Sequence, residues 1–334
     1  MTAPILEVEN LSVAFGTGRD EITVVEDVSF TLEAGATLGL VGESGSGKSV
    51  TSLAVMGLIH HQGGRVTNGS VRLNGRDLVG LSRRDWRSVH GSGMGMVFQQ
   101  PTRSLDPSFT VGEQVAEALR SHRRISRSEA WSAAVDMLRR VDIPDPERRA
   151  RDYPHMFSGG MAQRVMIAMA LICRPQVLIA DEPTTALDVT VQSAILDLIV
   201  ELQEETSIAV LFISHDLGVI AEVSDRVAVM YAGQIVEEAA TNDLLQQPQH
   251  PYALSLLESV PQVGGGRRLA TIPGRVPPMT QLPEGCRFHP RCRFAVEGTC
   301  TTDPIPLLLL DGSRSARCVR TDELFDEVSS RGIA

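Results

Sequence analysis

The feature that most constrains this chain is a glycine-rich octapeptide that directly follows a short apolar run. Residues 42–49 read GESGSGKS and match the pattern G-x4-G-K-[ST], and residues 37–41 predict a buried strand before it. Glycines let the backbone curl so that its N–H groups point at phosphate oxygens, and a following helix adds the positive end of its dipole. The motif therefore predicts a phosphate-binding loop that leads into a helix over 48–59.

Individual residues of this loop have distinct predicted roles. Lys48 is expected to reach the β- and γ-phosphates of a nucleotide, while the Ser49 hydroxyl is expected to ligate Mg²⁺. Further predicted contacts to the nucleotide come from Gly42, Ser44, Gly45, Gly47 and Thr51. The alternative is a glycine- and serine-rich turn that matches the pattern by chance, and the strand before it and the helix after it argue against that alternative.

Two adjacent acidic residues end a second predicted strand. The apolar residues 177–180 precede Asp181 and Glu182. Asp181 suits the Mg²⁺ shell, and Glu182 is placed to orient or deprotonate the water that attacks the γ-phosphate. A solvated acid pair is the common alternative at a strand end, and the phosphate-binding loop weighs against it.

A histidine and a glutamine complete the candidate site. His215 follows a third predicted strand over 209–213, where it could hydrogen-bond the γ-phosphate and hold water and Glu182 in register. Gln99 stands at the joint between the core and an inserted segment, where it could bind Mg²⁺ or the water. A structural histidine and a solvated amide are the alternatives, so both assignments depend on the other motifs.

The order of elements predicts two domains. Alternating strands and helices, with further helices over 161–172 and 192–204, predict a three-layer α/β core over 1–245. Residues from about 100 to 157 are rich in arginine and helix formers and predict a small helical subdomain. Eight of the 18 prolines lie in 261–306, and glycines occupy 264–266, so a loop-rich extension is expected over 246–334.

Charge and hydropathy exclude some classes of protein. There are 31 Lys plus Arg against 41 Asp plus Glu, a net charge of −10, which argues against general phosphate-driven binding to nucleic acid. The longest apolar run, residues 165–173, is far shorter than the about 20 residues of a bilayer span. The N-terminal sequence lacks the pattern of a secretory signal. We therefore expect a chain that does not cross a membrane by itself.

One further segment, Phe157–Arg164 with the sequence FSGGMAQR, resembles the signature sequence of ABC-type ATPases. The phosphate-binding loop, Gln99, this signature, the acid pair, residues 185–188 and His215 also follow the order of that family. Met161 stands where the commonest signature has glutamine, a variant similar to the oligopeptide/dipeptide importer branch. The resemblance implies a P-loop (RecA-like) ABC nucleotide-binding core of the α/β class, with a helical subdomain and a small Cys-rich C-terminal extension.

The resemblance also implies how two such domains work together. In this family two nucleotide domains close head to tail around two ATP molecules with Mg²⁺. Ser158, Gly159 and Gly160 would then face the γ-phosphate held by the opposite subunit, and Asp188 would cross the interface. Phe15 would stack on adenine. Whether the second ATPase subunit is another copy or a different chain stays open.

The residues His250–Ala253 and the cysteine-rich tail also look like the peptide-importer branch. The resemblance implies an ATPase peripheral to the cytoplasmic face of the inner membrane, bound to integral permease subunits and served by an extracytoplasmic peptide-binding protein. Import of nickel or another small solute is the first alternative. A soluble ATPase without a transport role and a non-enzymatic regulatory subunit are less favoured, because one complete set of ATPase motifs is present.

Four of the five cysteines, Cys286, Cys292, Cys300 and Cys318, follow the spacing C-x5-C-x7-C-x17-C. Four thiolates can hold zinc or an iron–sulfur cluster. The absence of a tight C-x2–4-C knuckle favours a [4Fe-4S] cluster, with zinc and four unrelated thiols as the alternatives. The positive charge nearby suits the net −2 of either metal site, and comes from Arg287, Arg291, Arg293, Arg317 and Arg320.

Overall fold

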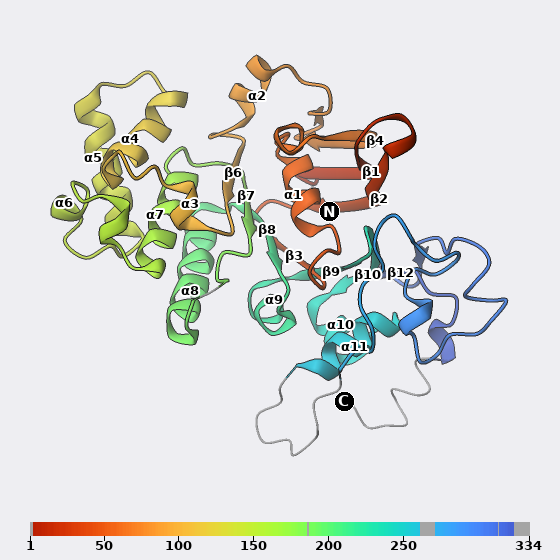
Figure 1. The fold of residues 1–334 in the computed structure, drawn as a ribbon. Coiled ribbons are helices and arrows are strands. Elements are labelled where there is room, and N and C mark those ends of the chain that lie inside the picture. The colour runs from red at the N-terminus through yellow and green to blue at the C-terminus, as the bar shows by residue number, and fades with distance from the viewer. Residues whose placement is uncertain (1–2, 186, 261–270, 313, 324–334) are drawn as a thin grey trace. The chain divides into compact units, whose positions relative to one another are not determined.

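The computed structural model describes residues 3–185, 187–260, 271–312 and 314–323 (Figure 1). The glycines at 264–266, part of the region predicted to be rich in loops, lie outside these residues. The chain divides into two compact units. The first unit comprises residues up to 6, 32–36 and 72–212, and the second comprises 7–31, 37–71 and the residues from 213 onward.

Two sheets organise the second unit. One contains β2 (Ile22–Leu32), β1 (Leu6–Phe15) and β4 (Gly64–Leu73), adjacent in that order. In the other, β3 (Thr37–Val41) pairs in parallel with β9 (Arg226–Tyr231), which pairs antiparallel with β10 (Gln234–Ala240). Two short strands, β12 (Ser315–Ala316) and β11 (Leu308–Leu309), continue this sheet. All five residues of β3 are buried, as its apolar sequence predicts.

The helices of the second unit are short. They are η1 (Gly18–Asp20), α1 (Lys48–Val55), η2 (Ile59–Gln62), α9 (Leu217–Val223), α10 (Thr241–Gln246), α11 (Pro251–Ser259) and η4 (His289–Arg291). The helix predicted over 48–59 ends at Val55, because Gly57 takes a left-handed φ of 67° and breaks the helical path. The described residues beyond 270 form loops apart from η4, β11, β12 and a helical segment at 321–323, as the proline content predicts.

Parallel strands form the centre of the first unit. β6 (Met94–Val97) pairs in parallel with β7 (Val177–Asp181), and β7 neighbours β8 (Ala209–Ser214), whose last two residues belong to the second unit. A two-residue strand, β5 (Arg76–Asp77), pairs with the end of β4. The helices α2 (Arg83–Val89), α7 (Gly159–Leu171) and α8 (Val189–Thr206) belong to this unit.

The segment between β6 and α7 is helical, as its composition predicts. It contains α3 (Pro101–Ser104), α4 (Val111–His122), α5 (Arg127–Arg140), α6 (Pro146–Arg149) and η3 (Pro154–Met156). The two longest helices, α4 and α5, each begin with a capping box, Thr110 with Glu113 and Ser126 with Glu129. α4 packs against α5 and α7 (Figure 1). None of the helices in the described part of the chain combines the length and apolarity that a bilayer crossing requires.

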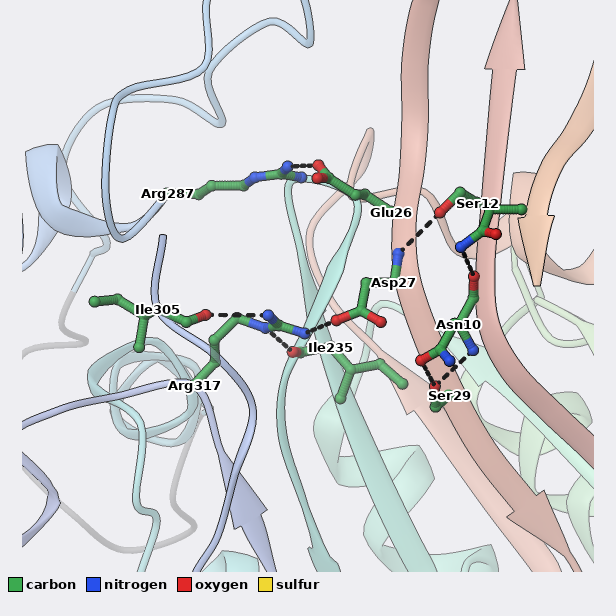
Figure 2. A network of polar contacts seen from close by, with 10 residues as sticks. Asn10, Ser12, Glu26, Asp27, Ser29, Ile235, Arg287, Ile305 and Arg317 are labelled. Atoms are coloured by element: carbon green, nitrogen blue, oxygen red, sulfur yellow. Dashed lines mark hydrogen bonds and ion pairs between the residues drawn. The ribbon is translucent and has the colours of Figure 1, made fainter. Parts of the chain in front are cut away.

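Arginines attach the C-terminal loops to the sheets of the second unit. Figure 2 shows Arg317, which donates to the Asp27 carboxylate at 3.2 Å and to the carbonyls of Ile235 and Ile305 at 3.0 Å each. Arg287 pairs with Glu26 in the same view and donates to the Ala232 carbonyl at 2.5 Å.

The five arginines near the cysteines also form ion pairs. Each of the five arginines has a carboxylate partner: Arg287–Glu26, Arg291–Glu43, Arg293–Glu258, Arg317–Asp27 and Arg320–Glu323. A planar guanidinium matches a carboxylate through two parallel hydrogen bonds, which a thiolate does not offer.

A buried histidine begins α11. The His250 side chain accepts the N–H of Tyr252 at 3.1 Å, and the His250 N–H donates to the Glu237 carboxylate at 2.7 Å. Only 1% of His250 is exposed. Burial, together with the nearby charge of Arg317, lowers the pKa of His250 to about 3.

This histidine predicts a pH dependence of stability. Unfolded histidine binds a proton with a pKa near 6.5, so the stabilisation is complete above about pH 6.5 and is lost as pH falls toward 3. When the pH falls from 7 to 5, His250 should lower the free energy of unfolding by about 2 kcal/mol. His250→Asn keeps a side-chain acceptor for the helix cap but has no group that titrates in this range. As the pH falls, its free energy of unfolding, measured by urea unfolding and circular dichroism, should therefore decline less than that of the wild type. Equal declines for both proteins would contradict the prediction.

Candidate active site

The phosphate-binding loop of the second unit depends on glycines where β9 comes close. A Cβ atom at Gly42 would collide with the carbonyl oxygen of Met230. Gly47, the residue before α1, has a φ of 106°, and a Cβ atom there would lie 2.7 Å from the Met230 Cε. Gly45 also has a positive φ, 82°, but faces open space. The close approach of the β9 backbone requires glycine at position 42, and the left-handed conformation favours it at position 47.

Lys48 is held at this loop by the loop's own backbone. Its Nζ donates to the carbonyl oxygens of Gly42 at 2.7 Å and Glu43 at 3.1 Å, and the residue is 5% exposed. The predicted phosphate and Mg²⁺ contacts Ser44, Gly45 and Ser49 are exposed, so a ligand can reach them. The glycine cradle, the lysine and the exposed hydroxyl fit a Mg²⁺-bound nucleotide.

Thr51 differs from the other predicted nucleotide contacts. It is fully buried, and its hydroxyl donates to the Gly47 carbonyl oxygen at 3.0 Å within the first turn of α1. This bond stabilises the start of the helix. A role for Thr51 in nucleotide binding stays a prediction.

In the first unit, the end of β7 carries the acid pair. Asp181 is the last residue of the strand and is 5% exposed. Glu182 has a φ of 48°, a left-handed conformation that is costly for a residue with a side chain. Such strain is concentrated at functional sites, where the surrounding structure fixes one side-chain direction.

The structure brings two predicted catalytic residues together. The Gln99 side-chain amide, beyond β6, donates to the Glu182 Oε2 at 2.7 Å. Thr185 donates its hydroxyl to the same oxygen at 2.8 Å. The Glu182 carboxylate is thus held by two neutral side-chain donors. Thr185 was not expected at the site; its position three residues after Glu182 is the signal that could have indicated it.

The predicted signature residues begin α7. Ser158 caps the helix by accepting the N–H of the third helical residue at 3.4 Å, and both Ser158 and Gly159 are exposed. A Cβ atom at Gly160 would lie 2.5 Å from a methyl group of Val191, so the glycine permits α8 to start close by. Asp188 caps α8 by accepting the Val191 N–H at 3.0 Å and is itself exposed.

His215 and Phe15 both belong to the second unit. His215 directly follows β8 and is exposed. Asp216 beside it caps α9 by accepting the Gly218 N–H at 2.8 Å. Phe15, the last residue of β1, is half-buried and packs against Gly64, where an added Cβ would lie 3.0 Å from the ring. Stacking of Phe15 on adenine stays a prediction.

The four cysteines of the extension are free thiols that line one pocket with Phe288 and Phe294. Among the described residues, however, no three or more His, Cys, Asp or Glu side chains are arranged as a metal-binding group. Burial raises the pKa of Cys292 to about 11 and that of Cys318 to about 12, so both favour the neutral thiol. The donor atoms suit a metal, and the predicted cluster stays a prediction.

The close approach at Gly42 yields a stability prediction. Gly42→Ala should lower the free energy of unfolding by about 3 kcal/mol, because the added methyl displaces β9 backbone. Gly45→Ala is the matched control, with left-handed strain of about 1–2 kcal/mol but no collision. Urea unfolding of both variants measures the difference. A Gly45 variant that is as unstable as the Gly42 variant would show that backbone strain, not contact with β9, is the cause.

Comparisons with known proteins agree with this site. A family model described as ABC transporter matches residues 25–185, and a model of the oligopeptide/dipeptide transporter C-terminal region matches residues 236–300. A relative from Brucella abortus (strain 2308), named as a peptide import ATP-binding protein, is 49% identical over 333 residues, covering 96% of this chain and 98% of the relative. Another from Brucella suis biovar 1 (strain 1330), also named as a peptide import ATP-binding protein, is 49% identical over 95% of each chain.

Solved structures show the same cassette. The dimeric ATP-binding cassette MJ0796, bound to ADP and Pi after hydrolysis, matches with a TM-score of 0.62 and 27% identity over 71% of this chain and 98% of that one. The cbiO1 protein of Clostridium perfringens, part of the ABC transporter complex cbiONQ, matches with a TM-score of 0.63 and 26% identity over 73% and 91%. The predicted P-loop ABC fold and ATPase activity are confirmed. The chain belongs to the ABC transporter family, as an ATP-binding protein that carries the oligopeptide/dipeptide transporter C-terminal region.

Proposed function

We propose that this chain is the ATP-hydrolysing subunit of an importer for dipeptides or oligopeptides. The observation that carries the proposal is the match to the oligopeptide/dipeptide transporter C-terminal region, which follows the match to the ABC transporter family in the same chain. The relatives named for peptide import, which match over nearly the whole chain, support it. ATP binding would close a pair of cassettes and reorient a separate permease, and hydrolysis would reopen the pair.

Each residue of the site then has a role. Lys48 and the loop glycines, with Ser44 and Thr51, bind the phosphates; Phe15 stacks on adenine. Mg²⁺ is held by Ser49, Asp181 and Gln99. Glu182 activates the water, and His215 contacts the γ-phosphate. The hydrogen bond from Gln99 to Glu182 supports the pairing of these two residues at one water.

The remaining residues would act between subunits. Ser158, Gly159 and Gly160 would complete the nucleotide site of a second cassette, across an interface that Asp188 crosses. The exposure of Ser158, Gly159 and Asp188 at the starts of α7 and α8 supports this arrangement. We place the assembly on permease subunits at the cytoplasmic face of the inner membrane, served by an extracytoplasmic peptide-binding protein. The proposed domains are an ABC ATPase cassette over 1–245, with its helical subdomain at about 100–157, and a C-terminal extension over 246–334.

The catalytic assignment predicts the behaviour of Glu182→Gln. Glutamine preserves the size and the contacts with Gln99 and Thr185 but removes the carboxylate. ATP turnover should fall by about 10²–10⁴-fold, because a positioned general base contributes that much. Affinity for ATP, measured by calorimetry, should change little. Wild-type turnover in this variant would refute the assignment.

Uptake by cells tests the transport function. Cells with the wild-type chain should accumulate a labelled dipeptide, and cells with Glu182→Gln should not, although the variant is present in the membrane fraction with its permease. Nickel uptake, measured in parallel, distinguishes the small-solute alternative. Loss of nickel uptake with normal peptide uptake would overturn the proposed substrate, and normal uptake of both would overturn the transport function.

We further propose that Cys286, Cys292, Cys300 and Cys318 hold a [4Fe-4S] cluster, with zinc as the alternative, which holds the proline-rich loops in place. Four half-buried free thiols on one pocket support the proposal. Protein purified without oxygen should contain about four irons and four acid-labile sulfides per chain. Cys318→Ser should lose them, and Cys173→Ala, far from this pocket in sequence, should keep them. One zinc without iron would replace the cluster by a zinc site, and neither metal would overturn both.

A further inference from the structure

Glu43, the second residue of the phosphate-binding loop, connects three parts of the second unit. Its N–H donates to the hydroxyl of Tyr252 in α11 at 2.8 Å. Its carbonyl oxygen accepts from Lys48 Nζ at 3.1 Å. Its carboxylate accepts two hydrogen bonds from Arg291, at 2.6 and 3.0 Å. The backbone and side chain of one loop residue are thus tied both to the predicted phosphate-binding lysine and to residues beyond 250.

Arg291 is built to hold that carboxylate in one place. Its side chain is 5% exposed, and its Nε donates to the Pro273 carbonyl at 2.7 Å, which fixes the orientation of the guanidinium. The guanidinium also lies 5.8 Å from the ring centre of Tyr231 and 5.9 Å from that of Phe288. Burial opposes the charge, yet the bonds to Glu43 raise the pKa of Arg291 above its usual value. Such a pair is directional and strong because both partners are charged.

The partners of Glu43 belong to one packed group. Tyr231 packs against Tyr252 with ring centres 4.7 Å apart, and Phe288 lies 5.2 Å from Tyr231 and 5.3 Å from Tyr252. Phe288 and Arg291 belong to the short segment between Cys286 and Cys292. The position of Arg291 therefore depends on the fold of the cysteine-rich loops.

A second contact route runs through the turn between β9 and β10. Arg287 donates to the Ala232 carbonyl at 2.5 Å, and the next residue, Gly233, donates its N–H to the Ser46 carbonyl of the phosphate-binding loop at 2.8 Å. The extension thus reaches the loop directly at Glu43 and indirectly at Ser46.

We propose that Arg291 is a positioning residue for nucleotide binding. Through Glu43 it holds the phosphate-binding loop in the conformation that accepts the phosphates, so that the C-terminal extension determines the affinity of the loop for nucleotide. The physical reason is preorganisation: a loop with three glycines has many conformations, and each one excluded before binding lowers the entropic cost of binding. Arg291 also neutralises a carboxylate that would otherwise stand unpaired in a phosphate site. The inference rests on the proposed assignment of this loop to ATP.

The test compares matched arginine variants of the full chain. Arg291→Ala should weaken MgADP binding, measured by calorimetry, by about tenfold, since a charge-assisted pair is lost. The KM for ATP should rise by a similar factor while kcat changes by less than about threefold, because Glu182 and Gln99 are untouched. Arg293→Ala is the control, because Arg293 comes from the same cysteine-rich segment and pairs doubly with Glu258 of α11. It should bind MgADP within about twofold of wild type.

Two further variants separate positioning from folding. Arg291→Lys keeps the charge but not the double hydrogen bond, so its affinity should fall between those of wild type and Arg291→Ala. Glu43→Gln combined with Arg291→Ala should be no weaker than Arg291→Ala alone, because both changes break the same contact. If Arg291→Ala does not fold, the MgADP affinities of Glu43→Gln and Arg291→Lys, compared with that of Arg293→Ala, still test the proposal. The proposal would be overturned if the Arg291 and Glu43 variants bound MgADP as tightly as Arg293→Ala. It would also be overturned if the losses of affinity from Glu43→Gln and Arg291→Ala added up in the double variant, or if Arg291→Ala lowered kcat and left KM unchanged.

A separate variant tests whether the loop binds nucleotide at all. Lys48→Ala should abolish MgADP binding in otherwise wild-type protein. Unchanged binding in Lys48→Ala would refute the proposed nucleotide site itself, whereas lost binding in Lys48→Ala with normal binding in Arg291→Ala would refute only the role of Arg291.

Discussion

The close approach of β9 to the phosphate-binding loop is the constraint on which the site of the second unit depends. Gly42 has no space for a side chain because the Met230 carbonyl lies against it, and Gly47 meets the Met230 side chain. The chain must therefore turn sharply between a fully buried strand and α1. That turn places the Gly42 and Glu43 carbonyls where Lys48 binds them, and it leaves Ser44 and Ser49 exposed to a ligand.

The C-terminal extension belongs to the same unit as this loop and is held by polar contacts more than by secondary structure. Its described residues beyond 270 contain little more than η4, two short strands and three helical residues at 321–323, so arginine–carboxylate pairs and packed aromatic rings fix the loops. Arg317 and Arg287 bind the β2 residues shown in Figure 2, and Arg291 binds Glu43. The extension therefore contacts the phosphate-binding loop directly, as part of the same compact unit.

Much of the fold follows from local sequence. The strands predicted at 37–41, 177–180 and 209–213 are present, each at most one residue longer, because continuous apolar runs bounded by polar residues suit buried strands. The helices predicted to begin at 161 and 192 start earlier, at Gly159 and Val189, because Ser158 and Asp188 cap them. Hydropathy alone missed these first turns, which contain glycines or exposed residues.

The sequence by itself determined the chemistry: the glycine cradle, Lys48, Ser49, the acid pair and the signature are contiguous motifs whose residue types define phosphate binding and hydrolysis. The contact of Gln99 with Glu182, in contrast, comes from the structure, where the Gln99 amide donates a hydrogen bond to the carboxylate. Only the tertiary structure decided which charges pair. Arg291 and Glu43 stand 248 positions apart, and Arg291 is surrounded in sequence by cysteines and other arginines. Local patterns report backbone conformation and burial, whereas the partner of a charge is chosen by which distant segments pack together.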